Sequence, residues 1–187
     1  MKGMRALFIP LNWQKMRGND NLVGIHTAYI SIGSNLGHKL ENCRKAIIAL
    51  TSCGKCDLID QSLIYQTEPV DFEDQDWFVN YAVKIETILD PFSLLDTLKS
   101  IERDAGRTGD TVRFGPRILD LDIILYDAKV VNTINLEIPH PRMHKRRFVL
   151  KPICDIDPDI IHPVFKQTMQ ALLEKIDTKG QRITEYK

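Results

Sequence analysis

The chain has 187 residues and carries 25 basic and 25 acidic side chains, so its formal net charge at pH 7 is zero. A neutral chain lacks the positive field of a general nucleic-acid binder, and we expect no nucleic-acid partner. Its apolar runs all fall short of the ~18 residues of a membrane helix, so we expect no membrane partner.

The first 26 residues show no hydrophobic periodicity and are interrupted by Pro10. They lack the longer apolar region and small-residue cleavage site of a secretory signal, and an organelle transit peptide is a weaker alternative. We predict that residues 1–26 form a poorly ordered N-terminal extension. Residues 27–187 are predicted to form a single domain, monomeric and cytoplasmic.

Alternation of side chains predicts the first strand over residues 28–33, with Ile30 and Ile32 on one face and Tyr29 and Ser31 on the other. The segment Gly-Ser-Asn-Leu-Gly at 33–37 is interpreted as a tight turn. A helix follows, because apolar residues then recur every three or four positions through residue 50.

Cys53 and Cys56 have the spacing of redox and zinc sites. No second pair of ligands follows, and we interpret the pair as a turn after the helix. The four cysteines are too few for a disulfide scaffold in a chain of this length, which favours a reducing compartment.

Further strands are predicted over residues 58–65 and 78–89, the second with clean alternation of buried and exposed positions. Asp90 and Pro91 are typical of a helix start, as an N-cap followed by proline, and Gly106 is typical of a helix end.

A strand rich in branched aliphatic residues comes next, then a short strand pair near 129–138, a basic segment and a helix after Thr168. The order of elements is β-α-β followed by β-α-β. It predicts an α/β (α+β) fold, a ferredoxin-like βαββαβ sandwich with extra C-terminal strands and a helix.

Asp120 and Asp122 lie within the aliphatic strand, where aspartate is disfavoured. Alternate residues share a face, so both carboxylates point the same way at a Cα separation of roughly 6–7 Å. Two unit charges at that distance repel by roughly 2 kcal/mol. A Mg²⁺ ion shared with substrate phosphates would remove this repulsion. The alternative is a solvated sheet face.

Basic residues surround the two aspartates in sequence. Arg107, Arg113 and Arg117 precede them, and a basic segment at 140–151 follows them. Arginine binds phosphate oxygens through two parallel hydrogen bonds. Although each arginine alone could be a solvated surface residue, the group indicates a polyphosphate ligand held without a Walker A loop, a motif that the sequence lacks.

Aromatic residues and one amide gather in residues 65–83, among them Phe72, Trp77, Phe78 and Asn80. Aromatic faces and an amide are what a flat heterocycle with an amide-like edge requires. The residues alone favour the alternative, which is core aromatics beneath a loop.

Several motifs resemble those of 6-hydroxymethyl-7,8-dihydropterin pyrophosphokinases, enzymes of folate biosynthesis. They are AYISIGSNLG, YQTEPV, QDWFVNYAV, IERDAGR, RFGPRILDLDIILYD and IPHPRMHKRRFVLKPICDIDPDIIHP, and they span residues 28–163. The resemblance implies a ferredoxin-like fold and transfer of pyrophosphate from ATP to the pterin hydroxymethyl oxygen. The implied products are AMP and the pterin diphosphate.

The resemblance also implies roles for individual residues. Asp120 and Asp122 would bind two Mg²⁺ ions and, with Arg107 and Arg117, form the catalytic set. The implied ATP site consists of Glu102, Arg107, Arg113, Phe114, Arg117, Ile123, His140 and Arg146. The implied pterin site consists of Thr67, Pro69, Val70, Phe78, Asn80 and Phe148, with the pterin ring between the two phenylalanines.

Two other functions remain open at this level. Paired strand aspartates also serve metal-dependent nucleotidyl transferases on related folds, and a small-molecule sensor could use the same fold without catalysis. The sequence also leaves open whether Asp122 only holds metal or also accepts the hydroxyl proton.

Overall fold

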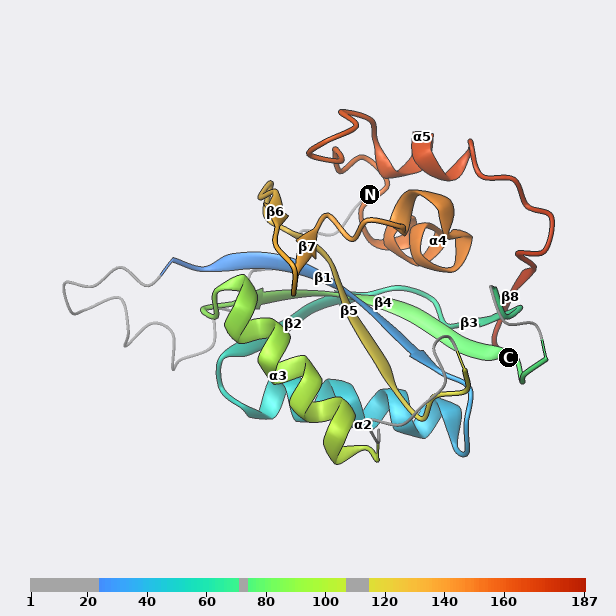
Figure 1. Ribbon diagram of the computed structural model, residues 1–187, viewed down its shortest axis with the longest axis horizontal. Coiled ribbons are helices and arrows are strands. Elements are labelled where there is room, and N and C mark those ends of the chain that lie inside the picture. The colour runs from blue at the N-terminus through green and yellow to red at the C-terminus, as the bar shows by residue number, and fades with distance from the viewer. Residues whose placement is uncertain (1–23, 71–73, 107–114) are drawn as a thin grey trace, which may run out of the picture.

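Figure 1 shows the computed structural model, which describes residues 24–70, 74–106 and 115–187. Within these residues an antiparallel sheet has the strand order β5-β1-β4-β3-β8, and β2 also pairs with β4. Its strands are β1 (His26–Ser34), β2 (Cys56–Gln61), β3 (Tyr65–Thr67), β4 (Phe78–Thr87), β5 (Asp120–Tyr126) and β8 (Ile183–Glu185).

Helices cover both faces of the sheet (Figure 1). One face carries α2 (Lys39–Ser52) and α3 (Pro91–Asp104), and the other carries α4 (Arg147–Ile156) and α5 (Met169–Leu173). A short hairpin of β6 (Val131–Asn132) and β7 (Glu137–Ile138) and a 3-10 turn, η1 (Met143–Lys145), lie between β5 and α4.

The predicted faces of the first strand are confirmed. Ile30 and Ile32 are buried in the core beneath α2 and α3, whereas Tyr29 is buried in the cluster beneath α4. Strand β1 is longer than predicted, running from His26 to Ser34. Two apolar cores therefore lie on opposite sides of one sheet.

The strand predicted over 58–65 is divided into β2 and β3. Both pair with β4, and Ser62 lies between them. The Ser62 N–H donates to the Ala82 carbonyl at 3.0 Å, and the Ser62 hydroxyl accepts from the Ala82 N–H at 2.9 Å. The Ser62 hydroxyl thus accepts the hydrogen bond that a backbone carbonyl would accept in a regular ladder, and the strand is interrupted there.

The predicted start and end of the second helix are confirmed. The Asp90 carboxylate accepts hydrogen bonds from the N–H groups of Phe92 at 2.9 Å and Ser93 at 3.3 Å, and Pro91 opens the helix. Gly106 follows the helix with φ of +100°, a conformation that favours glycine.

The basic segment at 140–151 contains elements that the sequence did not predict. Helix α4 begins at Arg147 and buries Val149, Leu150 and Ile153 against the sheet. Its Pro152 lies within the helix, which obscures the helical pattern. The final predicted helix is confirmed as α5, capped by Thr168.

The cysteine pair forms the predicted turn. Cys53 caps the C-terminus of α2, Cys56 opens β2, and all four cysteines are free thiols. Throughout the described part of the chain, no helix has the length and apolar character to span a membrane. Most of the predicted N-terminal extension, residues 1–23, lies outside the described residues.

Candidate active site

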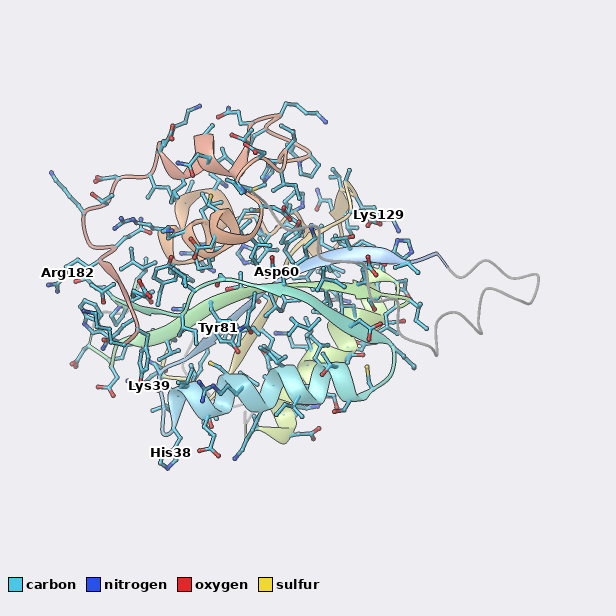
Figure 2. All side chains as sticks on the ribbon, turned by 180° about the vertical axis from the view of Figure 1, so that it is seen from behind. His38, Lys39, Asp60, Tyr81, Lys129 and Arg182 are labelled. Carbon is cyan, nitrogen blue, oxygen red and sulfur yellow. The ribbon has the colours of Figure 1, made fainter. Side chains whose placement is uncertain are left out.

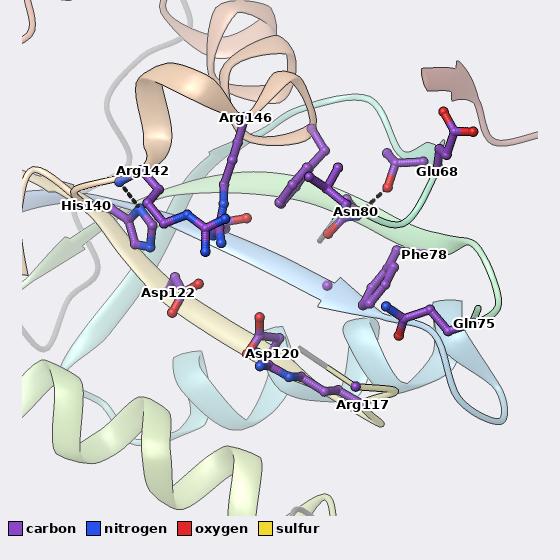
Figure 3. A pocket seen from close by; sticks show the side chains of 16 residues that line it. Glu68, Gln75, Phe78, Asn80, Arg117, Asp120, Asp122, His140, Arg142 and Arg146 are labelled. Carbon is purple, nitrogen blue, oxygen red and sulfur yellow. Dashed lines mark hydrogen bonds and ion pairs between the residues drawn. The ribbon is translucent and has the colours of Figure 1, made fainter. Parts of the chain in front are cut away.

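A cavity of ≈ 300 Å³ lies on the face of the sheet that α4 also covers (Figure 3). Four neighbouring strands, β5, β1, β4 and β3, supply its floor, and the segment from His140 to Phe148 supplies one wall. The lining residues are Ser31, Gly33, Thr67, Glu68, Val70, Gln75, Phe78, Asn80, Gly115, Arg117, Asp120, Asp122, His140, Arg142, Arg146 and Phe148.

The two strand aspartates share one face, as the alternation of β5 predicts. Asp120 and Asp122 line the cavity, whereas Leu119 and Leu121 are each 1% exposed and lie in the core beneath the helices. Register brings β1 beside them, since Gly33 pairs with Asp120. Strand β5, although mostly aliphatic, thus places two carboxylates in one cavity.

At this end Asp120 is ion-paired, and the surroundings of Asp122 oppose its charge. Arg117 donates from Nη1 to Asp120 Oδ1 at 2.6 Å. Burial, then the negative charge of Asp120, raises the pKa of Asp122 to about 6, although nearby cations oppose the shift. A divalent cation would stabilise both carboxylates in their ionised form, so this pair of oxygen donors fits Mg²⁺.

Basic side chains face the aspartates across the cavity. Figure 3 shows His140, Arg142 and Arg146 reaching toward Asp122 from the wall. The Arg142 N–H donates to His140 Nδ1 at 3.2 Å, which leaves the proton of a neutral imidazole on Nε2. Burial and the charges of Arg146 and Arg142 lower the pKa of His140 to about 4. This wall therefore combines fixed positive charge with a neutral hydrogen-bond donor, a combination that suits phosphate oxygens.

The other end of the cavity is aromatic and amide-bearing. Phe78 and Asn80 enter from β4, and Phe148 enters from α4. Asn80 is 5% exposed, and its Nδ2 donates to Thr67 Oγ1 at 2.7 Å. That bond orients the amide, while Phe78 and Phe148 offer flat apolar surface to a ring.

Gly33 provides the space that Asn80 occupies. A Cβ at Gly33 would lie 2.6 Å from Asn80 Oδ1, closer than real Cβ contacts allow. Glycine therefore leaves the room that the Asn80 amide occupies, and a larger residue at position 33 would force the amide to shift.

Asn35 connects the two ends of the site. It is fully buried at 0% exposed, and its Oδ1 accepts from the Arg117 N–H at 2.6 Å. Its Nδ2 donates to Gln75 Oε1 at 2.9 Å and to the Asp76 carbonyl at 3.2 Å. One side chain thus links the segment that carries Arg117 to the segment that leads into β4.

Three of the residues predicted for the site do not line the cavity. Glu102 is 1% exposed on the α3 side of the sheet, where its Oε1 accepts from the Leu121 N–H at 2.7 Å. Ile123 is 4% exposed and lies in the core, because it alternates with Asp122 along β5. Pro69 is buried beside the lining residues.

Ten predicted residues do line the cavity: Thr67, Val70, Phe78, Asn80, Arg117, Asp120, Asp122, His140, Arg146 and Phe148. The predicted residues Arg107, Arg113 and Phe114 lie outside the described residues. Six further lining residues were not predicted from the sequence: Ser31, Gly33, Glu68, Gln75, Gly115 and Arg142. Alternation placed Ser31 on the correct face of its strand, but only the pairing of Ser31 with Asp122 links it to the site.

A cavity that joins carboxylates, basic groups and aromatic rings on an antiparallel sheet is typical of a protein that binds small molecules. The family model for 7,8-dihydro-6-hydroxymethylpterin-pyrophosphokinase (HPPK) matches residues 29–158, and the chain belongs to this family. The family expected from the sequence motifs is thereby confirmed.

Curated relatives agree with this assignment. The 2-amino-4-hydroxy-6-hydroxymethyldihydropteridine pyrophosphokinase of Bacillus subtilis is 41% identical over 160 residues, which cover 86% of this chain and 91% of that protein. The folic acid synthesis protein fol1 of Schizosaccharomyces pombe is 37% identical over 179 residues, which cover 96% of this chain. The chain spans only about a quarter of the length of fol1, with 24% of that protein covered.

Solved structures share the fold. A crystal structure of Plasmodium falciparum HPPK-DHPS superposes with a TM-score of 0.65 at 16% sequence identity. The superposition covers 83% of this chain and 47% of that one. At this level of identity the likeness supports the fold alone.

Proposed function

We propose that this chain transfers the pyrophosphoryl group of ATP to the hydroxymethyl oxygen of 6-hydroxymethyl-7,8-dihydropterin in folate biosynthesis. The products are AMP and the pterin diphosphate. Membership of the HPPK family supports the type of reaction. The observation that carries the proposal is a single cavity with a carboxylate pair and basic wall at one end and an amide between aromatic rings at the other.

ATP occupies the charged end in this proposal. His140, Arg142 and Arg146 approach its phosphates from the wall, and Arg117 approaches them from the floor. Arginine forks match phosphate oxygens, and the neutral His140 adds a donor without a proton that titrates near pH 7.

The pterin ring lies between Phe78 and Phe148 in this proposal, and the Asn80 amide forms hydrogen bonds with the amide-like edge of the ring. The bond from Asn80 Nδ2 to Thr67 Oγ1 holds the amide plane in place before the ligand arrives. A preoriented amide costs less conformational entropy on binding than a free one.

Two Mg²⁺ ions complete the proposed site. Asp120 and Asp122 would hold them, because both carboxylates face the phosphate end, and burial beside Asp120 raises the pKa of Asp122. When bound there, Mg²⁺ would neutralise phosphate charge.

The transfer itself is an in-line displacement. The hydroxymethyl oxygen forms a bond to the β-phosphorus while the bond between the β-phosphorus and the AMP oxygen breaks. The chain contributes mainly by positioning the two substrates, and Arg117 and Arg146 stabilise the charge that develops on the phosphate oxygens. Asp122 faces the same end of the cavity, which makes its carboxylate the candidate acceptor of the hydroxyl proton.

We further infer that residues 27–187 form one domain with the ferredoxin-like arrangement. The strand order β5-β1-β4-β2, with α2 and α3 on one face, supports this classification. A monomeric cytoplasmic protein remains part of the proposal.

Analysis of the nucleotide products tests the function. The protein is incubated with ATP, Mg²⁺ and the hydroxymethyl dihydropterin, and the products are separated by ion-exchange chromatography. AMP formed in equal amount to the pterin diphosphate, without free pyrophosphate, supports the proposal. ADP formation, pyrophosphate release as from a nucleotidyl transferase, or binding without turnover as in a sensor would overturn it.

A further inference from the structure

We infer that the C-terminal segment at 177–187 is a clamp that holds the pterin end of the cavity in shape, with Arg182 as its positioning residue. The segment lies beyond residues 29–158, which the family model matches. The inference deepens the proposed function and rests on it for the identity of the ligand.

Strand β8 attaches this segment to the edge of the sheet. It pairs with β3, placing Ile183 opposite Thr67 and Glu185 opposite Tyr65. Figure 1 shows β8 and the C-terminus beside the start of β4. The chain thus returns, after α5, to the strand that contributes Thr67 to the cavity.

Arg182 forms hydrogen bonds with Glu68, the residue that follows β3. Its Nη2 and Nε donate to Glu68 Oε1 at 2.9 and 3.2 Å, and its backbone N–H donates to Glu68 Oε2 at 3.0 Å. The Glu68 N–H in turn donates to the Arg182 carbonyl at 3.0 Å. Glu68 lines the cavity, so this contact acts directly on its wall.

The same guanidinium reaches the other side of that wall. Its Cζ lies 5.0 Å from the centre of the Trp77 ring, and Trp77 immediately precedes Phe78. Arg182 therefore spans from Glu68 to Trp77, the two ends of the segment that joins β3 to β4. Figure 2 shows Arg182 at the outer edge of the molecule, outside the core.

Gln181 makes the matching contact to the opposite wall. Its Oε1 accepts from the Arg147 N–H at 2.8 Å, and its Nε2 donates to the Lys145 carbonyl at 3.1 Å. These partners flank Arg146 and precede Phe148, both of which line the cavity. The segment thereby ties the start of α4 to the end of β3.

The energetics favour a role in positioning over a role in folding. Exposed ion pairs contribute little to stability, and the Arg182 side chain is 70% exposed. Arg182 acts instead by positioning its neighbours, because its planar guanidinium orients Glu68 through hydrogen bonds and Trp77 through contact with the ring. Loss of this geometry should weaken pterin binding and leave the apolar cores intact.

Steady-state kinetics test the clamp with Arg182→Gln, Arg182→Lys and the control Lys179→Gln, which changes an exposed cation of the same segment. For Arg182→Gln we expect the pterin KM to rise about threefold to tenfold, with kcat and the ATP KM within about twofold of wild type. Arg182→Lys should give a smaller rise, because it keeps the charge and loses the fork. Lys179→Gln should match wild type.

Hydrogen exchange of the ligand-free proteins gives a second readout. The Glu68 amide should exchange faster in Arg182→Gln than in wild type and Lys179→Gln, at an unchanged melting temperature. An unchanged pterin KM overturns the positioning role, with or without faster exchange. If the wild-type protein does not turn over the pterin, the proposed function fails. Exchange at the Glu68 amide then tests the clamp separately: faster exchange in Arg182→Gln than in wild type supports it, and unchanged exchange overturns it.

Discussion

Asp122 is a residue whose charge the fold opposes. Burial and the neighbouring Asp120 raise its pKa to about 6 from the ordinary 3.8. The folded state therefore binds this proton more tightly than the unfolded chain does. Without metal, the protein should lose stability as the pH rises from about 4 to about 6.

Asp122→Asn removes this unfavourable charge. In EDTA at pH 7.5 we expect the free energy of unfolding to rise by about 1–2 kcal/mol, measured by urea denaturation. The gain should shrink at pH 4, where the folded wild type is already protonated. Asp96→Asn, at an exposed position of α3, serves as the control. Equal stability of Asp122→Asn and wild type at both pH values would contradict this account.

Gly33→Ala tests the close packing beneath the amide. The new Cβ would displace Asn80, because the two atoms would lie 2.6 Å apart, and the bond to Thr67 would break. We expect the pterin dissociation constant to rise at least about tenfold, measured by fluorescence titration, with the fold retained. In the control Gly24→Ala, the nearest atom to a new Cβ is His26 Nε2 at 3.4 Å. Wild-type pterin affinity in Gly33→Ala would show that the packing of Gly33 against Asn80 does not position the amide for binding.

At the scale of elements, the turn between β1 and α2 holds two segments together through Asn35. Asn35→Ala would leave the Arg117 N–H without its side-chain acceptor and release Gln75. A buried donor without a partner costs about 1–3 kcal/mol. We expect both the nucleotide and the pterin to bind more weakly, each titrated separately.

The matched control for this variant is Asn132→Ala, at an exposed position of β6. It should bind both ligands as wild type does. If Asn35→Ala weakened only one ligand, Asn35 would belong to one end of the cavity and would not connect the two.

The elements that could be predicted are those whose signals are local. Alternation identified the faces of β1, β4 and β5, and the Asp90 cap fixed the start of α3. The break at Ser62 depends on a bond to a neighbouring strand, which no local pattern contains. Helix α4 was missed because Pro152 and a run of basic residues hide its buried face.

The same division applies to the site. Asp120 and Asp122 could be placed on one face because a two-residue period is local to their strand. Ser31, Gly33 and Glu68 could not be placed, because their positions depend on strand register and on the return of β8. Ile123 and Asp122 are neighbours in sequence, but the strand directs them to opposite faces.

At the scale of the whole molecule, the cavity lies where segments distant in sequence meet. β5 brings the carboxylates, β4 brings the amide, and the segment before α4 brings the basic wall. The C-terminal segment contacts the start of α4 through Gln181 and the residue after β3 through Arg182. The central claim is that one cavity has two chemically distinct ends. A single substitution at one end should therefore weaken binding of the ligand at that end and leave binding of the other ligand unchanged.

A crossed binding measurement tests that claim most directly. Isothermal titration calorimetry is carried out with Mg²⁺ and α,β-methylene ATP, and separately with the hydroxymethyl dihydropterin, on wild type, Asn80→Ala and Asp122→Asn. We expect Asn80→Ala to weaken pterin binding at least about tenfold and Asp122→Asn to weaken binding of the metal-bound nucleotide by the same factor. Each variant should keep the other ligand within about twofold of wild type. Equal loss of both ligands in both variants, or loss of neither, would contradict the claim.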